Sequence, residues 1–177
     1  MQTFLTTTGP LYENLKVLDN KRLHKQALEA WQILMTLTDL NPAGDYRKAK
    51  GWKNHPAVLM WEGYESLLCA YAIAAVNEWE SRGFKSSLGP KIRRTMLDIE
   101  RKVPNVHHGE RPFWMRDKEL YEQITSSHRQ ALLVKDYSWY SLFCWPEDTG
   151  VPPTEYTYVW PVTIHSIREE IERSRLS

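Results

Sequence analysis

The stretch from His55 to Phe84 constrains the fold of this chain most. Pro56 suits the first position of a helix, where its missing amide hydrogen is not needed, and Gly83 suits the position just past a helix end. Apolar residues between them cover most of a helix circumference, so other helices or lipid must surround it. The longest run without charge, Ser66 to Asn77, has 12 residues, whereas a membrane span needs about 20. We therefore predict that 55–84 is the central helix of a soluble domain.

Length and composition fit one intracellular domain. A chain of 177 residues is long enough to bury a hydrophobic core without disulfides. Two cysteines do not form a disulfide framework, and no secretory apolar segment follows Met1, so we expect a cytoplasmic protein. The net charge of +1 excludes a globally basic nucleic-acid binder of the histone kind. Basic residues cluster within 16–53 and 82–102, which suits a basic face as well as ordinary solvated helices.

Capping residues and hydrophobic spacing predict further helices on both sides of this centre. Asp19 is a suitable N-cap for a helix that runs to about Asp39, and Asp117 for one that runs to about Lys135. We also predict an N-terminal arm over 1–10, a basic helix over 90–101, a short aromatic helix within 137–145, a loop over 146–162 and a C-terminal helix over 166–175. The predicted fold is all-α, with residues 1–177 forming a single compact helical domain.

One polar stripe on the helix after Asp19 carries the candidate chemistry. Arg22, Lys25, Gln26 and Glu29 recur at helical spacing, which places one carboxylate among two cations and an amide. A free N-terminal amine ionises near neutrality and can act as a nucleophile if the arm folds back onto this helix. Glu29 could then handle protons and stabilise positive charge on a sugar. On spacing alone, a surface ion pair between Lys25 and Glu29 is the simpler explanation of the stripe.

Other common catalytic motifs are missing from the sequence. It has no glycine-rich phosphate loop, no CxxC pair, no HExxH and no nucleophile elbow. His107 and His108 are adjacent and cannot share one helical face, so we expect no metal site.

Several short motifs resemble, in the same order, those of the phage pyrimidine-dimer DNA glycosylase/AP lyase family (endonuclease V type). The resemblance is stronger still to a group of uncharacterised bacterial relatives. The segment Leu23 to Glu29 is similar to one in which the phage enzyme has a leucine and, six residues later, its essential glutamate. The other matching segments are Met1 to Leu5, Asn54-His55-Pro56, Met60-Trp61, Arg82-Gly83-Phe84, Ser127 to Leu132, Lys135-Asp136, Trp139-Tyr140 and Tyr158 to Pro161.

The resemblance implies an all-helical enzyme that bends double-stranded DNA and extrudes a nucleotide. Its N-terminal amine would attack C1′ of a damaged pyrimidine nucleotide and form a Schiff base that can eliminate the 3′ phosphate. The implied catalytic residues are Met1, Gln2 and Glu29. The implied DNA-binding residues are Arg22, Lys25, Gln26, Lys50, Lys53, Asn54, His55, His128, Arg129, Lys135, Trp139 and Tyr140. The resemblance implies no cofactor, no metal and no membrane partner, and we expect a monomer.

Two residues differ from the phage pattern. Position 2 is Gln2, a bulky residue that methionine removal normally spares, so the amine of Met1 is the expected nucleophile. Leu28 stands where the phage enzyme has an arginine just before its glutamate. Three hypotheses follow: a glycosylase for dimers or for bulky modified pyrimidines, with or without lyase activity; a non-catalytic nucleic-acid-binding module; and an enzyme that acts on a free modified nucleotide.

Overall fold

The computed structural model describes residues 2–49, 51–104 and 106–161, and this part of the chain is helical with no strand. The all-α prediction is confirmed. The helices are α1 (Leu11–Lys16), α2 (Asn20–Thr38), α3 (Pro56–Leu59), α4 (Glu65–Ser81), α5 (Leu88–Lys102), α6 (Phe113–Arg116), α7 (Lys118–Lys135) and α8 (Tyr137–Tyr140), with 3-10 turns η1 (Trp52–Asn54) and η2 (Ser141–Phe143). The predicted helix over 166–175 lies outside the described residues.

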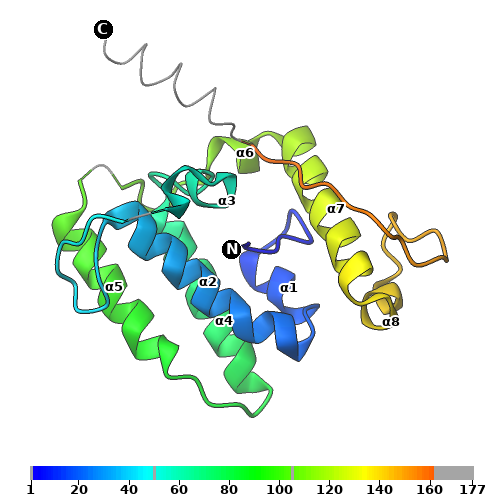
Figure 1. Cartoon of the computed structure of the whole chain (residues 1–177), viewed down its shortest axis with the longest axis horizontal. Helices are drawn as coiled ribbons and strands as arrows, with labels where there is room; N and C mark the ends of the chain where they lie inside the picture. The colour runs from blue at the N-terminus through cyan, green and yellow to red at the C-terminus, as the bar shows by residue number, and fades with distance from the viewer. Residues whose placement is uncertain (1, 50, 105, 162–177) are drawn as a thin grey trace, which may run out of the picture.

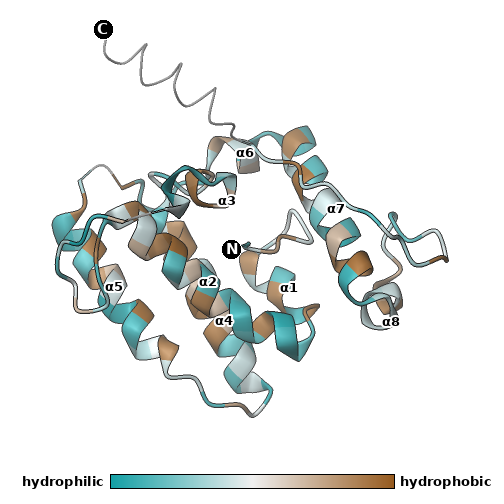
Figure 2. Ribbon diagram, viewed as in Figure 1, coloured by the Kyte–Doolittle hydropathy of each residue, from teal (hydrophilic) through white to brown (hydrophobic). Residues whose placement is uncertain are grey.

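Helix α4 is the central helix of the described fold. It packs against α1, α2 and α5, and its residues Leu68, Tyr71, Ala72 and Ala75 are fully buried. Figure 1 shows α2 lying across α4, with α5 on one side and α1 on the other. Figure 2 shows hydrophobic and hydrophilic residues alternating along α2, α5 and α7, as expected where one face of each helix is buried. No helix in the described part is long and apolar enough to cross a membrane.

The predicted single helix over 55–84 is wrong, because the chain folds there as two helices. Helix α3 ends at Leu59 and α4 begins at Glu65, with turns between them. Gly63 adopts a φ of +80°, which glycine tolerates best. Trp61, in the same turn, is fully buried and donates its indole N–H to Thr3 Oγ1 at 3.0 Å. Apolar residues run without interruption through this turn, so hydrophobic spacing alone did not reveal the break.

The flanking helices lie close to their predicted positions. Asp19 accepts from the backbone of Arg22 and begins α2, and Asp117 accepts from Glu119 and Leu120 and begins α7. Helix α5 begins at Leu88, two residues before its predicted start. The chain from Pro146 to Pro161 has no regular secondary structure and runs along α7, as drawn in orange in Figure 1.

Candidate active site

The N-terminal arm lies between α2 and α7 (Figure 1), and its residue Gln2 is hydrogen-bonded to Glu29. Residues Gln2 to Thr6 are buried, although the arm is extended and forms no helix. The backbone N–H of Gln2 donates to Glu29 Oε2 at 2.8 Å. Glu29 is half-buried on α2, so its carboxylate can meet both the arm and solvent.

Gln26 on α2 holds the arm against this helix. Its Oε1 accepts from the backbone N–H of Phe4 at 2.8 Å and from the hydroxyl of Tyr71 at 2.6 Å. Its Nε2 donates to the carbonyl of Gln2 at 3.2 Å. Gln26 is 1% exposed, so its amide is committed to the arm and is not presented to a phosphate.

His128 and Arg129 on α7 hold the arm from the other side. His128 Nδ1 accepts from the backbone N–H of Leu5 at 3.0 Å, and its Nε2 contacts the side-chain amide of Gln2. Burial lowers the pKa of His128 to about 3, so the ring is neutral at pH 7. Arg129 is buried and donates to the carbonyl of Thr6 at 2.9 Å.

Two carboxylates occupy the remaining donors of Arg129. Its guanidinium lies 2.7 Å from Glu147 and 2.6 Å from Glu122. Burial acts to raise the pKa of Glu147, but the hydrogen bonds that its carboxylate accepts from Arg129 and Ser126, together with the charge of Arg129, outweigh burial and lower the pKa. Like Gln26 and His128, Arg129 therefore holds the arm in place and leaves no donor for DNA, contrary to the role expected from the sequence.

A pocket of about 370 Å³ is lined by both Gln2 and Glu29. Its walls are Gln2, Phe4, Lys21, Arg22, Lys25, Gln26, Glu29, Lys135 and Tyr158. Four of these residues are cations, so the pocket suits an anionic ligand whose reacting atoms lie near one carboxylate.

The cations of the pocket differ in how firmly they are held. Arg22 is bound to Asp19 at 2.7 Å and donates to the carbonyl of Lys135 at 2.8 Å. Lys135 donates to the hydroxyl of Tyr156 at 2.7 Å. Lys21 and Lys25 are exposed and form no ion pair among the described residues. These two lysines are thus the side chains most available to phosphates.

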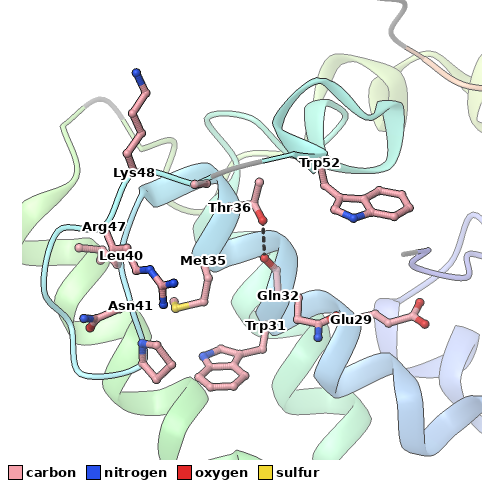
Figure 3. Close-up of a pocket in the computed structure, with 12 residues that line it drawn as sticks. Glu29, Trp31, Gln32, Met35, Thr36, Leu40, Asn41, Arg47, Lys48 and Trp52 are labelled. Carbon is pink, nitrogen blue, oxygen red and sulfur yellow. Dashed lines mark hydrogen bonds between the residues drawn. The ribbon is translucent and has the colours of Figure 1, made fainter.

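A second and larger hollow of about 860 Å³ shares Glu29 with this pocket. Figure 3 shows Glu29 and Trp52 toward one end of it and Arg47 and Lys48 toward the other. Trp52 is 52% exposed, which is unusual for a residue so large and apolar. A hollow with an exposed indole at one end and cations at the other suits a nucleic-acid base and its backbone.

The other predicted DNA-binding residues lie outside the two hollows. Lys53 is paired with Asp39 at 2.7 Å, Asn54 is exposed, and His55 accepts from Ala57 as the cap of α3. Burial lowers the pKa of His55. Met1 and Lys50 lie outside the described residues.

The aromatic pair on α8 has a structural role. Tyr140 is fully buried, and its hydroxyl donates to Asp19 Oδ2 at 2.5 Å. Trp139 donates its indole N–H to the carbonyl of Val17 at 2.9 Å. Both side chains hold α8 against the start of α2 and lie outside the pocket, so their predicted contact with DNA stays a prediction.

Sequence reasoning missed Lys21, Phe4, Tyr158 and Trp52 as lining residues. Lys21 could have been found, because it lies four and eight residues before Lys25 and Glu29 on the same helical face. Tyr158 could not, because nothing local in the sequence indicates that residue 158 lies beside residue 2.

The described part of the chain is all-helical, and it brings the N-terminal arm to the Glu29 carboxylate in a pocket lined by cations. A family model described as "Pyrimidine dimer DNA glycosylase" matches residues 1–89, half of the chain, and the chain belongs to this family. The match contains the arm, Gln26 and Glu29, and it ends before α7 and the 146–161 segment. No curated protein and no solved structure matches the chain.

Proposed function

We propose that this protein removes damaged or modified pyrimidines from duplex DNA and then cleaves the abasic strand through an N-terminal Schiff base. The observation that carries the proposal is the 2.8 Å hydrogen bond between the Gln2 backbone nitrogen and Glu29. The amine of Met1 belongs to the residue immediately before Gln2. If Met1 is removed, the nitrogen already beside Glu29 becomes the free amine.

The proposed reaction needs an amine, a carboxylate and the sugar of the extruded nucleotide bound beside both. The amine nitrogen bonds to C1′ of the extruded nucleotide while the bond from C1′ to the base breaks. Its surplus proton passes through Glu29 to the departing base, and the same carboxylate stabilises positive charge that develops on the sugar. Opening of the sugar ring then leaves a Schiff base, from which the 3′ phosphate can be eliminated.

The rest of the pocket supports DNA as the substrate. Lys21 and Lys25 precede Glu29 by two turns and one turn on the same face of α2, where they can neutralise backbone phosphates beside the extruded nucleotide. The dense hydrogen bonding of Gln2, Phe4, Leu5 and Thr6 fixes the arm before substrate arrives. Such preorganisation reduces the reorganisation required in the transition state.

Borohydride trapping on a duplex with one abasic site tests the lyase step. Wild-type protein should form a covalent adduct, and protein extended by two residues before Met1 should form far less, because its amine is displaced. Absence of an adduct with wild type would remove the Schiff-base mechanism.

Base release tests the glycosylase step. Duplexes carrying a cyclobutane thymine dimer, uracil or a glucosylated hydroxymethylcytosine cover small and bulky substrates. We expect Glu29→Gln to retain DNA binding and lose base release by about 100-fold or more, the usual scale for a catalytic acid–base group. Glu80→Gln, an exposed residue near the end of α4, is the matched control. Binding without any base release by wild type would instead indicate a non-catalytic nucleic-acid-binding module.

A further inference from the structure

The larger hollow offers more space than a single pyrimidine ring fills. Its volume is about 860 Å³. Cavities of about 300–1,000 Å³ typically hold whole drug-sized ligands, whereas a pyrimidine is one six-membered ring. The hollow adjoins the 370 Å³ pocket at Glu29, which lines both. A nucleotide whose C1′ lies beside Glu29 can therefore extend its base into the hollow, and the base alone would leave much of the hollow unfilled.

The end of the hollow that contains Glu29 also presents an aromatic side chain. Figure 3 shows the indole of Trp52 toward the same end as Glu29. Trp52 is 52% exposed, and the ring of His55 supports it at a centroid distance of 4.8 Å. Enzymes that extrude a nucleotide commonly stack its base on aromatic side chains. Trp52 is thus placed to stack on a base whose sugar lies at Glu29.

The opposite end of the hollow is cationic. Arg47 and Lys48 line it, both are exposed, and neither forms an ion pair among the described residues. The Asp39 carboxylate lies close enough to Lys48 to feel its charge. However, it is already paired with Lys53 at 2.7 Å and accepts from the backbone N–H of Ala49 at 2.8 Å. This end of the hollow therefore suits an acidic group.

The sugar-phosphate backbone of the extruded nucleotide does not reach this end. Its phosphates are bonded to the sugar, so they lie on the Glu29 side of the base. The ring edge farthest from the sugar includes C4 and C5. Position C5 carries the methyl group of thymine in the major groove, so a group can be added there without loss of base pairing. A chain on C5 of a base stacked on Trp52 is therefore the part of a substrate that can extend toward Arg47 and Lys48.

We propose that the larger hollow binds a substituent on C5 of the extruded pyrimidine, and that this substituent ends in an acidic group. This inference rests on the proposed function. Trp52 stacks on the base, and Arg47 and Lys48 bind the acidic end of the substituent. The substrate class is then a pyrimidine in duplex DNA with an anionic chain on C5.

The first test compares substrates with wild-type protein. One duplex carries a deoxyuridine with a short C5 chain that ends in a carboxylate, and a second carries the same chain ending in an uncharged amide. Duplexes with thymine or a thymine dimer lack the chain. In single turnovers we expect base release from the carboxylate duplex to be at least about fivefold faster than from the amide duplex, the scale of a partly exposed ion pair. Equal rates for the two chains, or faster release of thymine or of the dimer, would overturn the proposal.

The second test removes the cations. Arg47→Gln combined with Lys48→Gln should reduce the preference for carboxylate over amide to less than about twofold, because only the charged chain loses its partners. Arg116→Gln combined with Lys118→Gln removes the same charge from exposed positions outside both hollows and should keep the preference. If Arg47 and Lys48 instead bind backbone phosphates, their double variant would weaken all duplexes alike and keep the preference, which would overturn the proposal.

The third test concerns the aromatic end of the hollow. Trp52→Leu removes the stacking surface but keeps an apolar side chain, whereas Trp52→Phe keeps an aromatic ring. Base release from the carboxylate duplex should fall at least about fivefold in Trp52→Leu, the lower end of the range for base stacking, and by less in Trp52→Phe. Far-UV circular dichroism checks that both variants are folded. Equal losses in the two variants, or no loss in either, would show that stacking is not the role of Trp52 and would overturn the proposal.

A binding measurement separates this inference from the proposed function. Fluorine on C2′ slows base loss because it destabilises positive charge on the sugar, so complexes of wild-type protein with fluorinated duplexes can be followed by fluorescence anisotropy. The carboxylate duplex should bind at least about fivefold more tightly than the amide duplex. If it does, but unfluorinated duplexes lose no base and form no borohydride adduct, the proposed function fails and the ligand of the hollow stands. If every duplex loses its base at a similar rate and binds equally, the proposed function stands and this inference fails.

Discussion

Acidification should remove a stabilising contribution that comes from His128. The imidazole is fully buried between α7 and the arm, where burial lowers its pKa to about 3. In the unfolded chain its pKa returns to about 6.5. Between these two pH values the unfolded chain binds a proton that the folded protein does not. The free energy of unfolding should therefore fall as the pH falls through this window.

The expected size follows from the width of the window. At pH 4.5 the solution is about two pH units below the pKa of this histidine in the unfolded chain and still above its pKa in the folded protein. The free energy of unfolding should therefore be about 2.7 kcal/mol lower than at neutral pH. The loss should begin near pH 6.5 and continue toward pH 3. Because this is a sizeable part of the roughly 5–15 kcal/mol that stabilises a typical domain, it should be readily measured.

Urea denaturation followed by far-UV circular dichroism at pH 7.5 and pH 4.5 measures this contribution. His128→Asn is the comparison, since its Oδ1 can still accept from Leu5 but does not titrate. Burial raises the pKa of Glu65, which acts in the opposite direction, but this group is common to both proteins and cancels. Wild type should lose about 2–3 kcal/mol more than His128→Asn between the two pH values. A difference below about 0.5 kcal/mol would refute the assignment of a buried neutral imidazole.

Two further predictions concern DNA binding and the anchoring of the arm. Lys25→Gln should reduce the slope of log affinity against log salt concentration by about 0.9, whereas Lys53→Gln should reduce it less, because Lys53 is already paired with Asp39. Fluorescence anisotropy across a salt series measures both slopes, and equal slopes for the two variants would contradict the prediction. Arg129→Met should lower the free energy of unfolding at pH 7 by about 3–5 kcal/mol, because it leaves Glu147 partly buried without its cation. Urea denaturation measures that loss, and a change within about 1 kcal/mol would show that the pair contributes little.

Local chemistry in the sequence predicted most of the helices. The N-caps Asp19 and Asp117 form the expected hydrogen bonds, because capping depends on residues within one turn. The break at Gly63 escaped prediction because burial of Trp61 against Thr3 and Trp114 decides it, and both partners are distant in sequence.

The candidate site, too, was predicted in part from the sequence and decided in part by tertiary packing. Helical spacing placed Arg22, Lys25, Gln26 and Glu29 on one stripe of α2. It did not reveal that Gln26 is buried under the arm and that Lys25 is exposed, because burial depends on what packs above a helix.

By itself the sequence determined the all-α class, the positions of the long helices and the order of motifs that pointed to the family. The helices depend on residues within a few turns of one another, and the order of the motifs is read directly along the chain. Only the tertiary structure decided that Gln2 meets both Glu29 and His128, and that Tyr158 closes the same pocket. The contact between Gln2 and His128 joins residues 126 positions apart, and hydrogen bonds over such separations have no periodicity in the sequence.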